Sequence, residues 1–79
     1  MNTLEALTNI FREEFENDEL TITLSTTAKD IENWDSLANI NIIVASEREF
    51  NIKFTNQEIK SFLNVGDMIN MIDNKTSKG

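Results

Sequence analysis

The segment from Asn33 to Phe50 carries apolar side chains on two sides of a single expected helix, and this pattern restricts the fold more than any other feature of the chain. At about 100° per residue, the apolar positions fall into two stripes on roughly opposite sides. One stripe consists of Leu37, Ile40 and Val44, and the other consists of Ile42, Ile43 and Phe50. A chain of 79 residues has a thin core, so only one stripe can comfortably face it. We expect the other stripe to be covered by a loop or left exposed for a partner.

Ser36 begins this helix. Asp35 has a short acceptor side chain that suits the free N–H groups of a helix start, and Asn51 suits the left-handed backbone of a helix end. The first turn combines unpaired backbone donors with the positive end of the helix dipole, so it would stabilise an anion such as a phosphate ester on Ser36 Oγ. A serine at a helix start beside a possible docking stripe is typical of a modification site.

The chain contains no cysteine and no histidine. Their absence excludes disulfides, thiol catalysis, zinc clusters and a Ser-His-Asp triad. A functional Ser36 therefore takes its base from another protein, which favours the substrate of a modifying enzyme over an enzyme. We predict no catalytic residues, no metal site and no enzymatic activity of the chain itself.

The formal net charge of −7 limits the classes of partner. Nucleic acids and anionic membrane surfaces are disfavoured, because phosphate contacts depend on clustered Lys and Arg, whereas basic protein surfaces are favoured. No basic start leads into an apolar run, and no stretch approaches about 18 consecutive apolar residues, so neither a signal peptide nor a membrane span is predicted. We expect a cytoplasmic protein that does not insert into membranes.

Three further helices are predicted, which makes the chain all-α. The capping pairs that begin them are Asn2 with Glu5, Thr55 with Glu58, and Asn64 with Asp67. The first helix is expected to run from about Thr3 to Phe15, the second of the three to be short, and the last to end near Asp73. Residues 1–73 are thus predicted to form one domain, and residues 74–79 a flexible polar tail.

The run Asp35-Ser36-Leu37 and the positions that follow it resemble the acyl carrier proteins and their peptidyl and D-alanyl carrier relatives. The matching positions are Ile40, Ile43, Val44, Glu47, Glu49, Phe50, Ile52 and Phe54. Chain length, helix spacing and acidity also fit, so the resemblance covers almost the whole chain. Two positions depart from the family, because Asn33 stands where a glycine is usual and Trp34 where fatty-acid carriers usually have a small residue. Asparagine tolerates left-handed backbone angles, so the first departure is mild.

The resemblance implies a small four-helix bundle with three main helices, one short helix and a long first loop. It implies that a phosphopantetheinyl transferase uses magnesium and coenzyme A to attach 4′-phosphopantetheine to Ser36 Oγ. The thiol of this arm would hold acyl or aminoacyl groups as thioesters and present them to loading and transfer enzymes, with the protein as a monomer. The docking face implied for these partners comprises Leu37, Ile40, Asn41, Val44, Glu47 and Arg48.

Residues 17–34 lack helical periodicity, although Leu20, Ile22 and Leu24 alternate with polar residues as in a short strand. No second strong strand pattern is present to pair with them, so a loop held down by its own side chains is favoured, as in the carrier family. The expected anchors of this loop are Leu20, Ile22, Leu24, Ala28, Ile31 and Trp34. Trp34 is interpreted as a packing anchor rather than a platform for a ligand.

The cargo and two alternative functions remain open at this point. An aminoacyl or D-alanyl carrier would hold its cargo outside the helices, and a helical adaptor would bind a partner without any modification of Ser36. Ser46 lies on the Ile42 side of its helix, where fatty-acid carriers usually have a large aliphatic residue, and its hydroxyl is expected to bond to the Ile42 carbonyl. Phe62 is expected to fill space that an acyl chain needs, so we predict a short or polar cargo.

Overall fold

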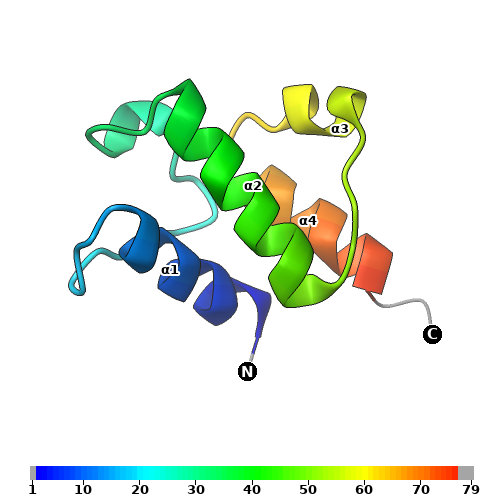
Figure 1. Cartoon of the computed structure of the whole chain (residues 1–79), viewed down its shortest axis with the longest axis horizontal. Coiled ribbons are helices and arrows are strands. Elements are labelled where there is room, and N and C mark those ends of the chain that lie inside the picture. The colour runs from blue at the N-terminus through cyan, green and yellow to red at the C-terminus, as the bar shows by residue number, and fades with distance from the viewer. Residues whose placement is uncertain (1, 77–79) are drawn as a thin grey trace.

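The computed structural model describes residues 2–76, which form four α-helices and one short 3-10 helix (Figure 1). The α-helices are α1 (Thr3–Glu14), α2 (Ser36–Phe50), α3 (Asn56–Ser61) and α4 (Val65–Thr76), and the 3-10 helix is η1 (Ala28–Asp30). The part of the chain that the structure describes has no strand, so the loop interpretation of residues 17–34 is confirmed. None of the described helices is long and apolar enough to cross a membrane.

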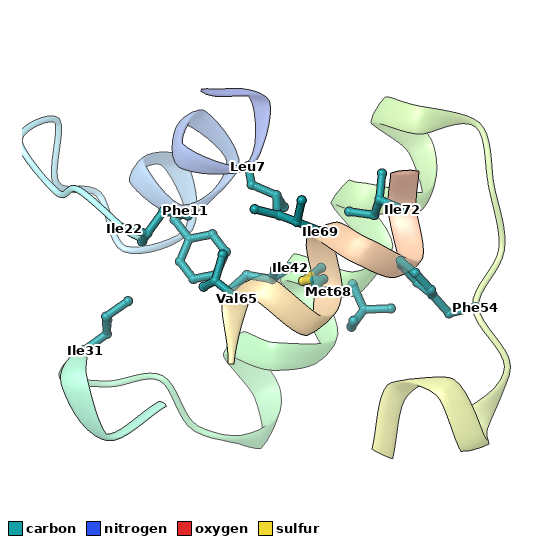
Figure 2. Close-up of a cluster of buried hydrophobic side chains, with 11 residues drawn as sticks. Leu7, Phe11, Ile22, Ile31, Ile42, Phe54, Val65, Met68, Ile69 and Ile72 are labelled. Carbon is teal, nitrogen blue, oxygen red and sulfur yellow. The ribbon is translucent and has the colours of Figure 1, made fainter. Parts of the chain in front are cut away.

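The helix α2 runs through the middle of the molecule, and α1 packs against both α2 and α4 (Figure 1). Side chains from these three helices meet in one hydrophobic core, much of which is visible in Figure 2. Its central members are Leu7 and Phe11 of α1, Ile42 and Ile43 of α2, and Val65, Met68, Ile69 and Ile72 of α4. The Ile42 side of α2 is therefore the core side, as the two-stripe pattern allowed.

The helix ends are fixed by the capping side chains that the sequence indicates. The Asn2 side chain accepts from the Glu5 N–H at 2.8 Å, and the Asn64 side chain accepts from the Asp67 N–H at 2.8 Å. Thr55 and Glu58 form a complete capping box at the start of α3. The observed bounds of α2 match the predicted ones, and Asn51 ends it in the left-handed conformation with φ 57°.

The C-terminal boundary of α4 differs from the prediction. The helix continues through Thr76, three residues beyond the predicted end near Asp73, so residues 74–76 of the predicted polar tail are helical. Lys75 Nζ lies 3.1 Å from Glu58 Oε1 of α3, and Thr76 Oγ1 donates to the Ile72 carbonyl at 2.9 Å. These side-chain contacts hold a last turn that lacks apolar residues, which is why the apolar periodicity did not reveal it. Residues 77–79 of the predicted tail lie outside the described residues.

The long loop between α1 and α2 is anchored by some of the predicted side chains and not by others. Ile22 and Ile31 are buried, and Leu20 and Trp34 pack against the core. Leu24 is 56% exposed and Ala28 is exposed, so the prediction that these two are anchors is wrong.

Backbone contacts take the place of the Leu24 side chain. The first N–H groups of α4 donate to loop carbonyls, Val65 N to Thr26 O at 2.9 Å and Gly66 N to Leu24 O at 2.8 Å. A Cβ at position 66 would lie only 2.9 Å from the Leu24 oxygen, so the glycine permits this close approach. Because the backbone itself lies on α4, the Leu24 side chain projects outward.

Candidate functional site

Ser36 is the first residue of α2, and its side chain is exposed. Asp35 is the N-cap residue, with an extended backbone, and its Oδ1 accepts from the Ala38 N–H at 2.9 Å. The Asp35 carbonyl also accepts from the Asn39 N–H at 2.9 Å. Asp35 therefore performs the predicted capping role, and the Ser36 hydroxyl is left accessible to a modifying enzyme.

The backbone that leads into this helix start turns sharply at Asn33. Asn33 has φ 68°, and its carbonyl accepts from the Asp35 N–H at 3.0 Å. Only glycine, asparagine and aspartate adopt this left-handed conformation readily. The structure thus gives the physical reason why asparagine replaces the usual glycine here without loss of the turn.

Trp34 fixes the end of the loop to two parts of the molecule. Its ring packs edge-to-face on Phe11, with centroids 5.0 Å apart and an interplanar angle of 89°. Its indole Nε1 donates to Asn39 Oδ1 of α2 at 3.1 Å. Because the indole nitrogen is only a donor, the asparagine atom that faces it must be the oxygen. The predicted anchoring role of Trp34 is confirmed.

A cleft of about 400 Å³, hereafter the Ser36 cleft, opens beside this serine. It separates the start of α2 from α3 and from the start of α4, and its walls combine aromatic, aliphatic and carboxamide groups. Its lining residues are Ala28, Trp34, Asp35, Ser36, Asn39, Ile59, Phe62, Leu63, Asn64, Val65 and Met68. Asn39, Leu63 and Asn64 were not predicted as site residues from the sequence. Only the position of Asn39 one turn after Asp35 offered a signal for it.

The apolar stripe of α2 that does not face the core, hereafter the Leu37 stripe, faces solvent in the described structure. Its residues Leu37, Ile40 and Val44 are 67%, 57% and 44% exposed. Large aliphatic side chains are rarely exposed together along one helix face unless the face meets a partner. The stripe starts next to Ser36, so a modifying enzyme that contacts it also reaches the serine.

The polar residues predicted for the docking face differ in how firmly the protein itself holds them. Asn41 Nδ2 donates to Glu14 Oε2 of α1 at 3.0 Å. Glu47 is partly buried, and its Oε2 accepts from the Phe54 N–H at 2.9 Å, which fixes the chain after α2. Arg48 is exposed in the last turn of α2. Glu47 therefore has a structural role in addition to any contact it makes with a partner.

No family model matches the chain. Among solved structures, the chain is similar to a holo acyl carrier protein from Geobacter metallireducens, with a TM-score of 0.87 and 45% sequence identity. The alignment covers 95% of this chain and 86% of that chain. The likeness confirms the predicted all-α bundle of three main helices and one short helix, and the recognition of the family from the residues around Ser36. At this identity and coverage, the chain belongs to the acyl carrier protein family.

Proposed function

We propose that Ser36 Oγ carries a 4′-phosphopantetheine arm, on which the protein holds acyl groups as thioesters and presents them to partner enzymes. The observation that carries the proposal is the exposed hydroxyl at the start of α2, between the Leu37 stripe and the Ser36 cleft. Attachment joins Ser36 Oγ to the pantetheine-bearing phosphorus of coenzyme A and breaks the pyrophosphate P–O bond. It releases adenosine 3′,5′-bisphosphate and passes the hydroxyl proton to a base of the transferase.

The residues around Ser36 fit such a group. The first N–H groups of α2 have no intrahelical partner, and together with the helix dipole they favour the negative charge of a phosphodiester. Asp35 Oδ1 is occupied by the Ala38 N–H, so one carboxylate oxygen is already compensated. When bound, the arm supplies the thiol that this cysteine-free chain lacks.

The Leu37 stripe is proposed as the docking face for the phosphopantetheinyl transferase and for the enzymes that load and receive the acyl group. Its exposed aliphatic side chains provide contact area, and the net charge of −7 favours enzymes with a basic rim. Nucleic acids are not proposed as partners, for the same electrostatic reason. We propose that the protein meets these enzymes in the cytoplasm and as a monomer.

The direct test is incubation with coenzyme A, magnesium and a broad-specificity phosphopantetheinyl transferase, followed by intact-mass and peptide-mapping mass spectrometry. We expect the wild-type chain to gain the mass of one phosphopantetheine group on Ser36, and Ser36→Ala to gain none. Ser25 and Ser61 are exposed and serve as internal controls, whereas Ser46 is buried. Modification at Ser25 or Ser61 would contradict the assignment to Ser36. No modification at all would also contradict it, and would favour an unmodified adaptor that uses the Leu37 stripe.

A further inference from the structure

The Ser36 cleft leads away from the serine toward two other helices. Ile59 belongs to α3, Phe62 follows α3 directly, and Met68 belongs to α4, and all three line the same cleft as Ser36. A group attached to Ser36 that lies along this cleft therefore contacts side chains of α3 and α4. The volume of about 400 Å³ is near the lower end of the range of about 300–1,000 Å³ for ligand pockets, which suits a small group.

The interior behind the cleft is already filled. Phe62 packs edge-to-face on Phe54, with ring centroids 5.4 Å apart and an interplanar angle of 83°. Phe54 is itself a core residue, and Ile42 and Ile72 of the same core are fully buried (Figure 2). A long acyl chain can enter only by separating the Phe54–Phe62 pair and displacing close-packed side chains.

The inner face of α2 also provides little apolar surface that would stabilise an acyl chain inside the bundle. Ser46 is fully buried on this face, and its Oγ donates to the Ile42 carbonyl at 2.8 Å. A serine contributes less apolar surface than an aliphatic side chain at the same place, and apolar contact is what drives methylene groups out of water. The predicted bond from Ser46 to Ile42 is confirmed, and it makes this position polar at the centre of the bundle.

The cleft, in contrast, offers groups that suit a short acyl thioester. Trp34 and Phe62 supply aromatic walls, and Asn39 and Asn64 supply carboxamides. The Oδ1 atoms of the two asparagines accept from Trp34 Nε1 and from the Asp67 N–H. Their Nδ2 groups are therefore the atoms that remain to donate to a carbonyl or hydroxyl of the cargo.

We infer that the group carried on Ser36 is a short acyl group that lies in the Ser36 cleft, between Trp34 and Phe62, and does not enter the helix bundle. This inference rests on the proposed attachment of the arm to Ser36. It names the class of cargo as an acyl group of a few carbons, with room for a polar substituent that accepts from Asn39 or Asn64.

The test compares holo protein with acetyl, butyryl and octanoyl forms, prepared from the corresponding coenzyme A thioesters. Intact mass is measured first, so a failure to load counts against the attachment at Ser36 and is separated from the cargo question. We expect the acetyl and butyryl groups to shift the side-chain amide NMR signals of Asn39 and Asn64 and to change the emission of Trp34, the only tryptophan in the chain. The octanoyl group should leave the methyl signals of Ile43 and Ile69 where the holo form has them.

Octanoyl-specific shifts at Ile43 and Ile69 would overturn the inference, as would acetyl and butyryl forms that leave the signals of the cleft unchanged. Phe62→Ala tests directly whether the Phe54–Phe62 pair blocks entry of an acyl chain. We expect this variant to show the octanoyl-specific shifts that the wild type lacks. Phe62→Leu is the second variant, because it preserves more of the packing on Phe54. Leu24→Ala is the matched control, since Leu24 is a large aliphatic residue that is 56% exposed and does not line the cleft, and it should behave as the wild type does. If the octanoyl group leaves the Ile43 and Ile69 signals unshifted in both Phe62 variants, Phe62 is not what keeps the acyl chain out of the bundle.

Discussion

At the scale of single residues, Asp35 determines how well the helix that bears Ser36 begins. Its Oδ1 satisfies the Ala38 N–H, one of the free donors of the first turn of α2. We predict that Asp35→Ala lowers the free energy of unfolding by ~1 kcal/mol, within a range of about 0.5–2 kcal/mol for lost N-caps. Urea unfolding followed by circular dichroism measures this change.

Two variants control that experiment. Asp35→Asn keeps a side-chain acceptor and should remain near the wild type. Ser36→Ala removes an exposed hydroxyl but leaves the cap, so we expect a loss of at most ~1 kcal/mol. A Ser36→Ala variant that failed to fold would show that the serine has a structural role and would weaken it as a modification control.

Ser46 is the second residue whose substitution is informative. Ser46→Ala removes a hydroxyl whose acceptor, the Ile42 carbonyl, also belongs to the helix ladder, so we predict a change within about 1 kcal/mol. Ser46→Leu forces extra atoms into a fully buried position, and we predict a loss of ~1–3 kcal/mol. Chemical denaturation distinguishes the two, and a Ser46→Leu variant more stable than the wild type would reveal unfilled space that the structure does not show.

The residue scale also shows where local sequence signals are sufficient. The Ser46–Ile42 bond and the left-handed Asn33 were both predictable, because each depends on a residue and its neighbours along the chain. The exposure of Leu24 was not predictable in this way. It depends on the contact of the Leu24 carbonyl with Gly66, which lies far along the sequence.

At the scale of helices, α3 is held to α4 through Glu58. The backbone N–H of Thr55 and the ammonium group of Lys75 both stabilise the charged Glu58 carboxylate, and they hold its pKa below the usual value of 4.5. A carboxyl whose pKa is lower in the folded state stabilises the fold above its unfolded pKa, and this contribution is lost as the pH falls through the folded pKa. We predict that Glu58→Gln lowers stability at neutral pH and flattens the loss of stability on the acid side.

The measurement is the midpoint of thermal unfolding between neutral pH and the range below 4.5, for the wild type and Glu58→Gln. Lys75→Met is the matched variant. It removes the ion pair but leaves the charged carboxylate in the Thr55–Glu58 capping box, whereas Glu58→Gln removes the charge from both contacts, so the effect of Lys75→Met should be the smaller one. An equal or larger effect of Lys75→Met would show that the ion pair outweighs the cap.

Arg48 lies in the last turn of α2, at the end of the helix far from Ser36, between the acidic residues Glu47 and Glu49. We predict that Arg48→Glu improves kcat/KM with an enzyme of general fatty-acid synthesis, because a basic enzyme face then meets a carboxylate instead of a like charge. The same change removes a cation from the negative end of the helix dipole and should lower stability by about 0.3–1 kcal/mol. Improved turnover despite lower stability would identify docking as the cause, and unchanged or poorer turnover would contradict the prediction.

At the scale of the whole molecule, the sequence predicted the helices more completely than the site that they form. The capping pairs and the apolar periodicity are local, so the order of the four helices and the bounds of α2 followed from the chain alone. The Ser36 cleft is not local, because Trp34, Phe62 and Met68 come together only when α3 and α4 pack beside the start of α2. Ser36 was predicted as a candidate site because its signal is the local helix start, whereas Asn39 and Asn64 line the cleft only once α3 and α4 have packed beside α2.

The charge of the whole chain leads to the last prediction, which concerns the rate of partner docking. The chain has seven more acidic than basic side chains on a small surface. This charge attracts a basic enzyme at long range, and salt screens the attraction. The screening length falls from about 10 Å at 0.1 M ionic strength to about 3 Å at 1 M, so kcat/KM of the phosphopantetheinyl transferase should fall steeply over this range. Ile40→Ala removes apolar contact instead, and we predict that it lowers kcat/KM by about tenfold, which corresponds to ~1.4 kcal/mol, at every salt concentration. A loss for Ile40→Ala that disappears at high salt would contradict the division between an electrostatic approach and an apolar contact at the Leu37 stripe.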